Sequence, residues 1–378
     1  MAFLRSSTVN LLNLHYAIHA LALSGSGMFI AAFLLKAGVS APLVMVALAA
    51  ILMGRFCIRP FVIPLARRTG LKPLVIAGTL ITSLQYPLLA QVQGLSWPLL
   101  GLCVVSSLGD TLYWTTYHAY FASLGDSEER GHQISAREAA ATLGGIVAPL
   151  ATGWALMTVG PQIAFGATAV ALALSALPLL LTPNVAVATE ADFSLRQAMP
   201  AVLLMACDSW SWAGYGLVWQ MALFLALHEN FAAFGGAMAL AALVGAVSGL
   251  AVGRLIDFGH GRRVVWLSAG GLALMTALRA AGYGHPILAV VANAAGAVAF
   301  AIHTPTVMTA IYNLAKASAC PLRFHVATEA GFDISGTIAY LIAGAMIWAG
   351  APLWAGISLA FLSIAAVFVL LSRYYRPA

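Results

Sequence analysis

Long apolar runs separated by short polar segments limit how this chain can fold more than any other feature. A helix that crosses the hydrocarbon core of a bilayer needs about 20 predominantly apolar residues, and the sequence contains twelve runs of that kind. They cover residues 10–35, 41–64, 73–93, 97–123, 133–158, 162–182, 199–227, 232–256, 264–283, 286–314, 325–349 and 352–372. The sequence therefore predicts an all-α integral membrane protein with twelve transmembrane helices.

The overall composition agrees with that prediction. Hydrophobic residues make up 62% of the chain and charged residues 8%, whereas about a quarter of the residues in a soluble domain are charged. The four cysteines lack metal-ligand spacing, and we interpret them as small buried hydrophobes. The N-terminus MAFLRSS has no small-residue cleavage site, so we expect the first apolar run to be retained.

The positive charges indicate an orientation. Lys and Arg near helix ends stay on the cytoplasmic side, and with the N-terminus inside, all of the 18 Lys and Arg except Lys36 and Arg279 fall on that side. We expect both termini to be cytoplasmic and the protein to lie in the cytoplasmic (inner) membrane. The net charge of +6 then reflects this topology and contact with anionic lipid, not with nucleic acid.

The polar segment 184–196 divides the chain into residues 1–183 and 197–378, with six predicted spans each. The two parts resemble each other at a shift of 191 residues, which pairs Glu138 with Glu329 and Gly153 with Gly344. Many secondary transporters are built from such repeats, with the binding site near the bilayer midplane between the halves. We therefore predict two six-helix bundles joined by a cytoplasmic linker.

The loops between predicted helices 2 and 3 and between 8 and 9 resemble the signature G-x-L-A-D-R-x-G-R-K of the major facilitator superfamily. The second loop, GRLIDFGHGRR, fits through Asp257, Gly261, Arg262 and Arg263, with one extra residue. The first, IPLARRTGLK, has Arg67 where the family has its acid. GGIVAPLATG in helix 5 is similar to the Gly-Pro pattern of the superfamily's antiporters. The resemblance covers the whole chain and implies the twelve-helix fold of that family.

The arginine at position 67 leads to a hypothesis about gating. In the family this loop acid faces the start of helix 11, where the positive end of the helix dipole favours a negative charge. Helix 11 here carries its own acids, Glu329 and Asp333, so we predict a latch from Arg67 to Glu329. In the other half we expect Asp257 to lie near Arg137. Independent, solvated loop charges are the alternative.

Several polar residues lie inside predicted spans. An ionisable residue costs at least ~2.5–3.5 kcal/mol at the centre of a span, so it is expected to face the protein interior and to be functional. Asp110 shares one helical face with Tyr113, Trp114, Tyr117 and His118. Such a face suits a water-filled cavity between the halves.

Helix 7 has a similar face. Asp208, Trp212, Tyr215 and Trp219 recur at helical spacing. The resemblance implies that helices 1, 4, 7 and 10 line the cavity, and helices 1 and 10 also carry polar residues inside their spans. These residues are His15 and His19 on helix 1, and Asn293 and His303 on helix 10.

We assign roles from this chemistry. Burial favours the neutral form of a carboxylic acid and histidine titrates near neutral pH, so we predict proton coupling through Asp110, Asp208, His118 and His303. The substrate-binding candidates are the remaining polar and aromatic residues of the four helices. They are His15, His19, Tyr113, Trp114, Tyr117, Trp212, Tyr215, Trp219 and Asn293. For Arg55 and Arg59 on helix 2 two interpretations stay open, snorkelling to the inner interface or binding an anionic solute, and Arg279 is expected to reach the outer head groups.

No enzyme motif is present: the phosphate-binding G-x-x-x-x-G-K-[ST], G-x-S-x-G and H-E-x-x-H are all missing from the sequence. We expect no metal and no cofactor, and a monomer in the membrane. The predicted function is secondary transport of a small organic solute, proton-coupled, with export by antiport favoured. The alternatives are proton-coupled uptake of an organic anion, sugar or nucleoside-like solute, and a non-transporting membrane receptor or assembly protein on the same fold.

Overall fold

The computed structural model describes residues 7–124, 130–187, 193–256, 261–318 and 320–375. Of the side chains within these ranges, those of residues 122, 130–142, 250–256, 261, 262 and 321 are outside the description. The predicted gating residue Asp257 therefore lies outside the described residues. The same holds for the side chains of Arg137 and Arg262.

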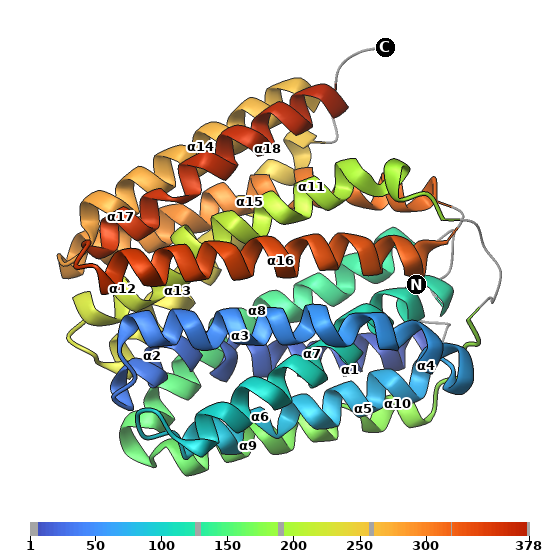
Figure 1. The fold of residues 1–378 in the computed structure, drawn as a ribbon, viewed down its shortest axis with the longest axis horizontal. Coiled ribbons are helices and arrows are strands. Elements are labelled where there is room, and N and C mark those ends of the chain that lie inside the picture. Colours follow the sequence, from blue (N-terminus) through green and yellow to red (C-terminus); the bar gives the residue numbers. More distant parts are fainter. Residues whose placement is uncertain (1–6, 125–129, 188–192, 257–260, 319, 376–378) are drawn as a thin grey trace.

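The described chain is a bundle of helices that run along one long axis (Figure 1). The N-terminal half (residues 1–183) contains α1 (Ser7–Ser24), η2 (Ser26–Phe29), α2 (Ile30–Lys36), α3 (Ala41–Ile58), η3 (Arg59–Phe61), α4 (Val62–Thr69), α5 (Leu71–Ser83), α6 (Gln85–Ala90), α7 (Trp97–Leu124), α8 (Arg130–Thr158), α9 (Pro161–Leu174) and α10 (Leu177–Leu180). The C-terminal half (residues 197–378), with the helix that leads into it, contains α11 (Leu195–Ser211), η4 (Trp212–Val218), α12 (Trp219–Ala226), α13 (Phe231–Ile256), α14 (Gly261–Gly282), α15 (Pro286–Lys316), α16 (Pro321–Trp348), α17 (Leu353–Ser358) and α18 (Ala360–Tyr374).

Within the described residues, nine helical segments are long and apolar enough to cross a membrane. They match nine of the predicted spans, and the other three predicted spans are also helical, as α7, α8 and α11 through α12. The all-helical class is thereby confirmed. The count of twelve spans, the cytoplasmic termini and the division into two bundles stay predictions.

The two halves meet along two helix pairs, α3 against α16 and α8 against α13. Glycines allow close approach at both: a Cβ at Gly153 would lie 2.4 Å from the carbonyl oxygen of Phe231, and one at Gly344 would lie 3.3 Å from that of Pro42. Gly153 and Gly344 are partners in the internal repeat. The repeat thus corresponds to equivalent packing positions at the two seams, and the Gly-Pro pattern of helix 5 has a packing role.

Aromatic residues join the halves at the end of the bundle that the sequence assigns to the outer side. Phe29 contacts Phe234 with ring centroids 5.2 Å apart, and Phe33 lies 6.2 Å from Phe231. These residues belong to one buried apolar cluster that includes helices of both halves. At its rim, Lys36 and Glu229 form an exposed ion pair of 2.9 Å. The predicted outer end is therefore closed, since apolar side chains of both halves fill it.

Candidate functional site

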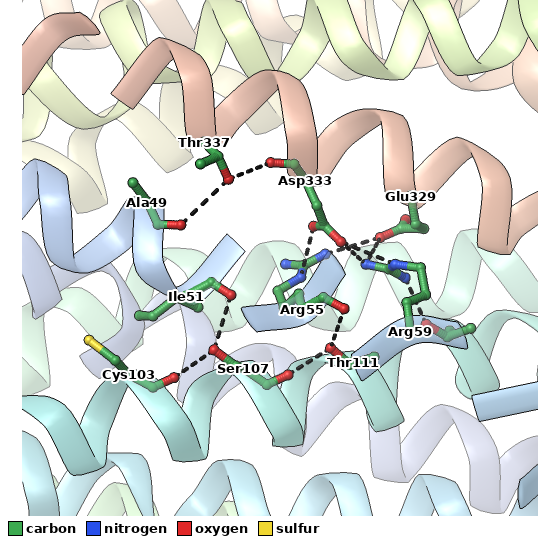
Figure 2. Close-up of polar contacts among 11 residues, drawn as sticks. Ala49, Ile51, Arg55, Arg59, Cys103, Ser107, Thr111, Glu329, Asp333 and Thr337 are labelled. Atoms are coloured by element: carbon green, nitrogen blue, oxygen red, sulfur yellow. Dashed lines mark hydrogen bonds and ion pairs between the residues drawn. The ribbon is translucent and has the colours of Figure 1, made fainter. Parts of the chain in front are cut away.

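Two arginines and two acids connect the halves inside the bundle. Figure 2 shows Arg55 and Arg59, at the end of α3 and the start of η3, directed at Glu329 and Asp333 of α16. Arg55 Nη2 lies 3.1 Å from Glu329 Oε2, and its Nε lies 3.0 Å from Asp333 Oδ1. Arg59 Nε donates to Asp333 Oδ2 at 3.1 Å, and Arg59 Nη2 also contacts that oxygen. The same Nη2 lies 3.6 Å from Glu329 Oε2.

The spacing of these residues explains the arrangement. Side chains four residues apart lie one above the other on the same helical face, so each helix presents a pair of like charges to an opposite pair on its neighbour. The side chains of Arg59 and Asp333 are 1% and 0% exposed, and those of Arg55 and Glu329 are 12% and 13% exposed. The α7 helix adds a neutral partner, because Arg59 Nη1 donates to Thr115 Oγ1 at 2.8 Å.

Asp110 of α7 belongs to the same electrostatic unit. Its charge interacts with those of Arg55, Arg59, Glu329 and Asp333. We call these five residues the inter-half charge cluster. On its predicted cytoplasmic side, the rings of His118 and His325 stack with centroids 5.9 Å apart, and both interact electrostatically with Glu329.

The contacts of the cluster bear on two interpretations of the sequence. Arg55 and Arg59 do not snorkel to a membrane interface, because their guanidinium groups are buried against acids of α16. Glu329 pairs with these two arginines, whereas the predicted latch residue Arg67 is exposed at the end of α4. Arg67 lies two helical turns beyond Arg59, and the deeper arginines satisfy the acids. The gating roles of Arg67 and of the exposed Arg263 stay predictions.

The predicted polar face of helix 4 divides into two. Tyr113 and Tyr117 are fully buried against α1, whereas Asp110, Trp114 and His118 are partly exposed. The three partly exposed residues recur every fourth position, so they form a narrower stripe that looks toward the seam with α16. The two tyrosines instead belong to the core of the N-terminal half.

The histidines of helix 1 contact those tyrosines. His15 Nδ1 donates to the carbonyl oxygen of Ser175 at 2.7 Å, and its Nε2 lies 3.1 Å from the hydroxyl of Tyr113. His19 stacks on Tyr113 with ring centroids 3.9 Å apart. A carbonyl can only accept, so the proton of neutral His15 is on Nδ1 and Nε2 accepts from the tyrosine. His15 and His19 are therefore buried in the core of the N-terminal half.

In the C-terminal half, Asp208 of α11 pairs with His303 of α15. Asp208 Oδ1 lies 3.5 Å from His303 Nε2, and His303 Nδ1 lies 2.8 Å from Ser268 Oγ of α14. The side chain of Asp208 is 29% exposed and that of His303 is 3% exposed. The structure thus brings together two of the four predicted proton-coupling residues.

The predicted face of helix 7 is interrupted by a π-helical segment, η4. Such segments often occur at functional sites. Tyr215 and Trp219 are buried, and Trp219 Nε1 donates to Asn293 Oδ1 at 3.0 Å, whereas Trp212 is partly exposed. The wider turn breaks the 3.6-residue period, and the substrate-binding roles of Trp212, Tyr215 and Trp219 stay predictions.

Sequence reasoning missed several of the residues that complete these contacts. Thr115, Ser268 and His325 give no signal in the sequence, because a hydroxyl or ring in a helix is unremarkable until its neighbours are known. The pairing of Arg55 and Arg59 with helix 11 had a signal. Two arginines four residues apart and two acids four residues apart, each on an apolar helix, are complementary.

A membrane-type helical bundle whose two halves meet at a buried charge cluster has the architecture of a solute carrier. The family model of the Major Facilitator Superfamily matches residues 12–319. The chain belongs to this superfamily of secondary transporters, and it is a multi-pass membrane protein. No curated protein sequence matches it significantly.

Solved structures share this fold at low sequence identity. A POT family transporter in complex with 5-aminolevulinic acid has a TM-score of 0.76 and 10% identity, covering 98% of this chain and 96% of that one. An auto-inhibited POT family peptide transporter and a point mutant of the nucleoside transporter NupG each have a TM-score of 0.66 and 14% identity, with 98% of both chains covered. At these identities the likeness is one of fold.

Proposed function

We propose that this protein is a proton-coupled secondary transporter of a small organic solute, working by alternating access. The observation that carries the proposal is the composition of the inter-half charge cluster, which has three acids and two arginines. Arginine stays protonated in proteins. The cluster therefore has one carboxylate more than its arginines neutralise, and a bound proton would balance it.

The position of the cluster links that proton to the conformational cycle. Arg55, Arg59 and Asp110 belong to the N-terminal half, and Glu329 and Asp333 to the C-terminal half. Separating the halves at this seam would leave two acids without their arginines, and an uncompensated buried charge is strongly unfavourable. Protonation of these acids would favour the separated state. This is the physical basis on which we infer coupling between proton binding and opening.

The Asp208–His303 pair supplies a second titratable group in the other half. Histidine can pass a proton to a neighbouring group, and the partial exposure of Asp208 gives protons access to the pair. The partly exposed rings of Trp114 and Trp212 suit contact with an organic solute. One of the similar structures is a complex with 5-aminolevulinic acid, and the other two are of a peptide transporter and a nucleoside transporter. We include such solutes in the class to be screened.

The test uses the full chain in proteoliposomes that contain a pH-sensitive dye. Amino acids, 5-aminolevulinic acid, di- and tripeptides and nucleosides are applied one at a time, and the luminal pH is recorded. A solute that drives protons in its own direction identifies a symporter, and one that drives them the opposite way identifies an antiporter. We expect antiport, because the sequence of helix 5 is similar to the Gly-Pro pattern of the superfamily's antiporters.

Variants then assign the proton site. Asp110→Asn and Asp208→Asn should each abolish solute-driven proton movement. The control is Glu190→Gln, which also neutralises an acid but lies in the predicted linker, and this variant should still move protons. If no solute moves protons in the native protein, or if both aspartate variants behave like the native chain, the proposal is wrong.

A further inference from the structure

Arg279 is a buried arginine that the cluster does not include. It lies three residues before the end of α14, near the predicted outer end of the bundle, and is 4% exposed. The sequence predicts that it reaches lipid head groups, and the structure corrects this: the side chain turns inward, between α15 and the π-helical segment of helix 7. A Cβ at Gly296 would lie 2.3 Å from Arg279 Nη2, so the guanidinium packs directly against this glycine of α15.

The hydrogen bonding of this guanidinium is incomplete. Its Nη1 donates to the carbonyl oxygen of Tyr215 in η4, and its buried Nε has no hydrogen-bond partner among the described residues. Arginine has five N–H donors. The ring centroids of Trp219 and Phe300 lie 5.2 Å and 5.7 Å from its central carbon. The guanidinium thus lies close to two aromatic rings with its Nε donor unused.

No carboxylate within the described part of the chain balances this charge. The electrostatic partner of Arg279 is Tyr215, whereas Arg55 and Arg59 each contact both Glu329 and Asp333. The acid at the same end of the bundle, Glu229, pairs with Lys36. A buried charge without a partner is costly, and capping one carbonyl needs only a neutral donor. The positive charge of Arg279 therefore requires another explanation.

We propose that Arg279 is an anion-binding residue that receives a carboxylate group of the transported solute. This inference rests on the proposed transport function and names the chemical class of its solute. A planar guanidinium binds a carboxylate through paired N–H groups. The rings of Trp212 and Phe300, 6.2 Å apart and partly exposed, form the edge from which a solute group reaches the site.

The same helix orients the rest of the solute. Asp208 lies on helix 7, toward the predicted cytoplasmic side from Tyr215, and Tyr215 interacts electrostatically with both Asp208 and Arg279. A solute with its carboxylate at Arg279 would extend toward Asp208. The anionic end of the solute and the proton-binding acid would then occupy opposite ends of one binding region.

Binding to the detergent-purified full chain tests this without transport. The probes are acetate, benzoate and glutarate, each compared with its uncharged amide, and the readout is the ligand-induced shift of the thermal unfolding midpoint. The native protein should be stabilised by at least one carboxylate and not by its amide. Arg279→Met should weaken that binding by roughly tenfold or more, as expected for a hydrogen bond to a charged group.

Two further variants serve as controls. Arg373→Met removes an exposed arginine from the last turn of α18, a residue with no proposed role, and should leave carboxylate binding unchanged. Arg279→Lys keeps the charge but not the paired geometry, and should give intermediate affinity even if Arg279→Met folds poorly. The inference is overturned if native protein does not distinguish carboxylates from amides, or if both Arg279 variants bind like native. Because the readout is binding, either result is separate from a failure of proton coupling.

Discussion

Neutralising an arginine of the inter-half charge cluster should destabilise the protein far more than neutralising an acid. Arg59→Met removes the hydrogen bonds to Asp333 and Thr115 and leaves three acids facing one arginine. Asp333→Asn also removes ion pairs, but it leaves two acids facing two arginines. The charge count therefore separates two changes that both break the same contact.

The magnitudes follow from burial. Both side chains are almost completely inaccessible, and removing one partner of a buried ion pair costs about 3–5 kcal/mol because the other charge is left uncompensated. We expect Arg59→Met to lie in this range. For Asp333→Asn we expect about 1–3 kcal/mol, as for lost hydrogen bonds to charged groups. The double variant has the same excess of one acid as the native cluster and should be more stable than Arg59→Met alone.

The assay is a denaturant titration of detergent-solubilised protein at neutral pH, giving the free energy of unfolding for the native chain, both single variants and the double variant. A double-mutant cycle should give a coupling energy of about 1 kcal/mol or more, since residues in one ion-pair network are not additive. At acidic pH the deficit of Arg59→Met should shrink, because protons neutralise the surplus carboxylates. Equal losses for the two single variants, or strict additivity in the double variant, would refute the charge-balance argument.

The predicted outer end, the two-half seam and the core of the N-terminal half give further outcomes. Lys36→Gln and Glu229→Gln should each cost less than about 1 kcal/mol, because that pair is half exposed; a loss as large as that of a buried pair would contradict this. Gly235→Ala would place a Cβ 2.3 Å from a carbonyl oxygen of α8 and should cost about 1–3 kcal/mol, whereas Gly236→Ala, with no atom within 4 Å, is its control. His15→Leu removes the hydrogen bonds to a buried carbonyl and to a tyrosine hydroxyl and should cost about 1–3 kcal/mol. The same denaturant titration measures the free energy of unfolding of each variant. A native value for His15→Leu would show that its hydrogen bonds do not contribute to stability, and a native value for Gly235→Ala would show that the two helices are not closely packed there.

The arrangement of buried charges was only partly predictable. The sequence shows that Asp110, Glu329 and Asp333 lie in apolar helices and must be compensated, because an isolated charge is unfavourable there. It does not show the rotation and depth of one helix relative to another. The loop motif therefore indicated Arg67 as the partner of Glu329, whereas in the structure Glu329 and Asp333 lie opposite Arg55 and Arg59.

Local backbone geometry accounts for the other differences. The helical period predicts a regular helix 7, but the structure has a π-helical segment there, and Tyr215 and Trp219 are buried in the core. Arg279, which the charge rule had assigned to the outer head groups, donates to the carbonyl of Tyr215 in this segment. Hydropathy and charge bias report which residues avoid lipid, and they carry no information on which interior neighbour a side chain will meet.

What the sequence determined by itself is the membrane class, the positions of the helices and the internal repeat. These depend on the length, period and spacing of apolar residues along one chain, and each helix satisfies its own backbone hydrogen bonds inside a bilayer. The tertiary structure decided which charges pair, how the face of helix 4 divides, and which arginine is left without an acid. Those outcomes depend on distances of a few ångströms between helices far apart in the sequence, which only the packing of the two halves determines.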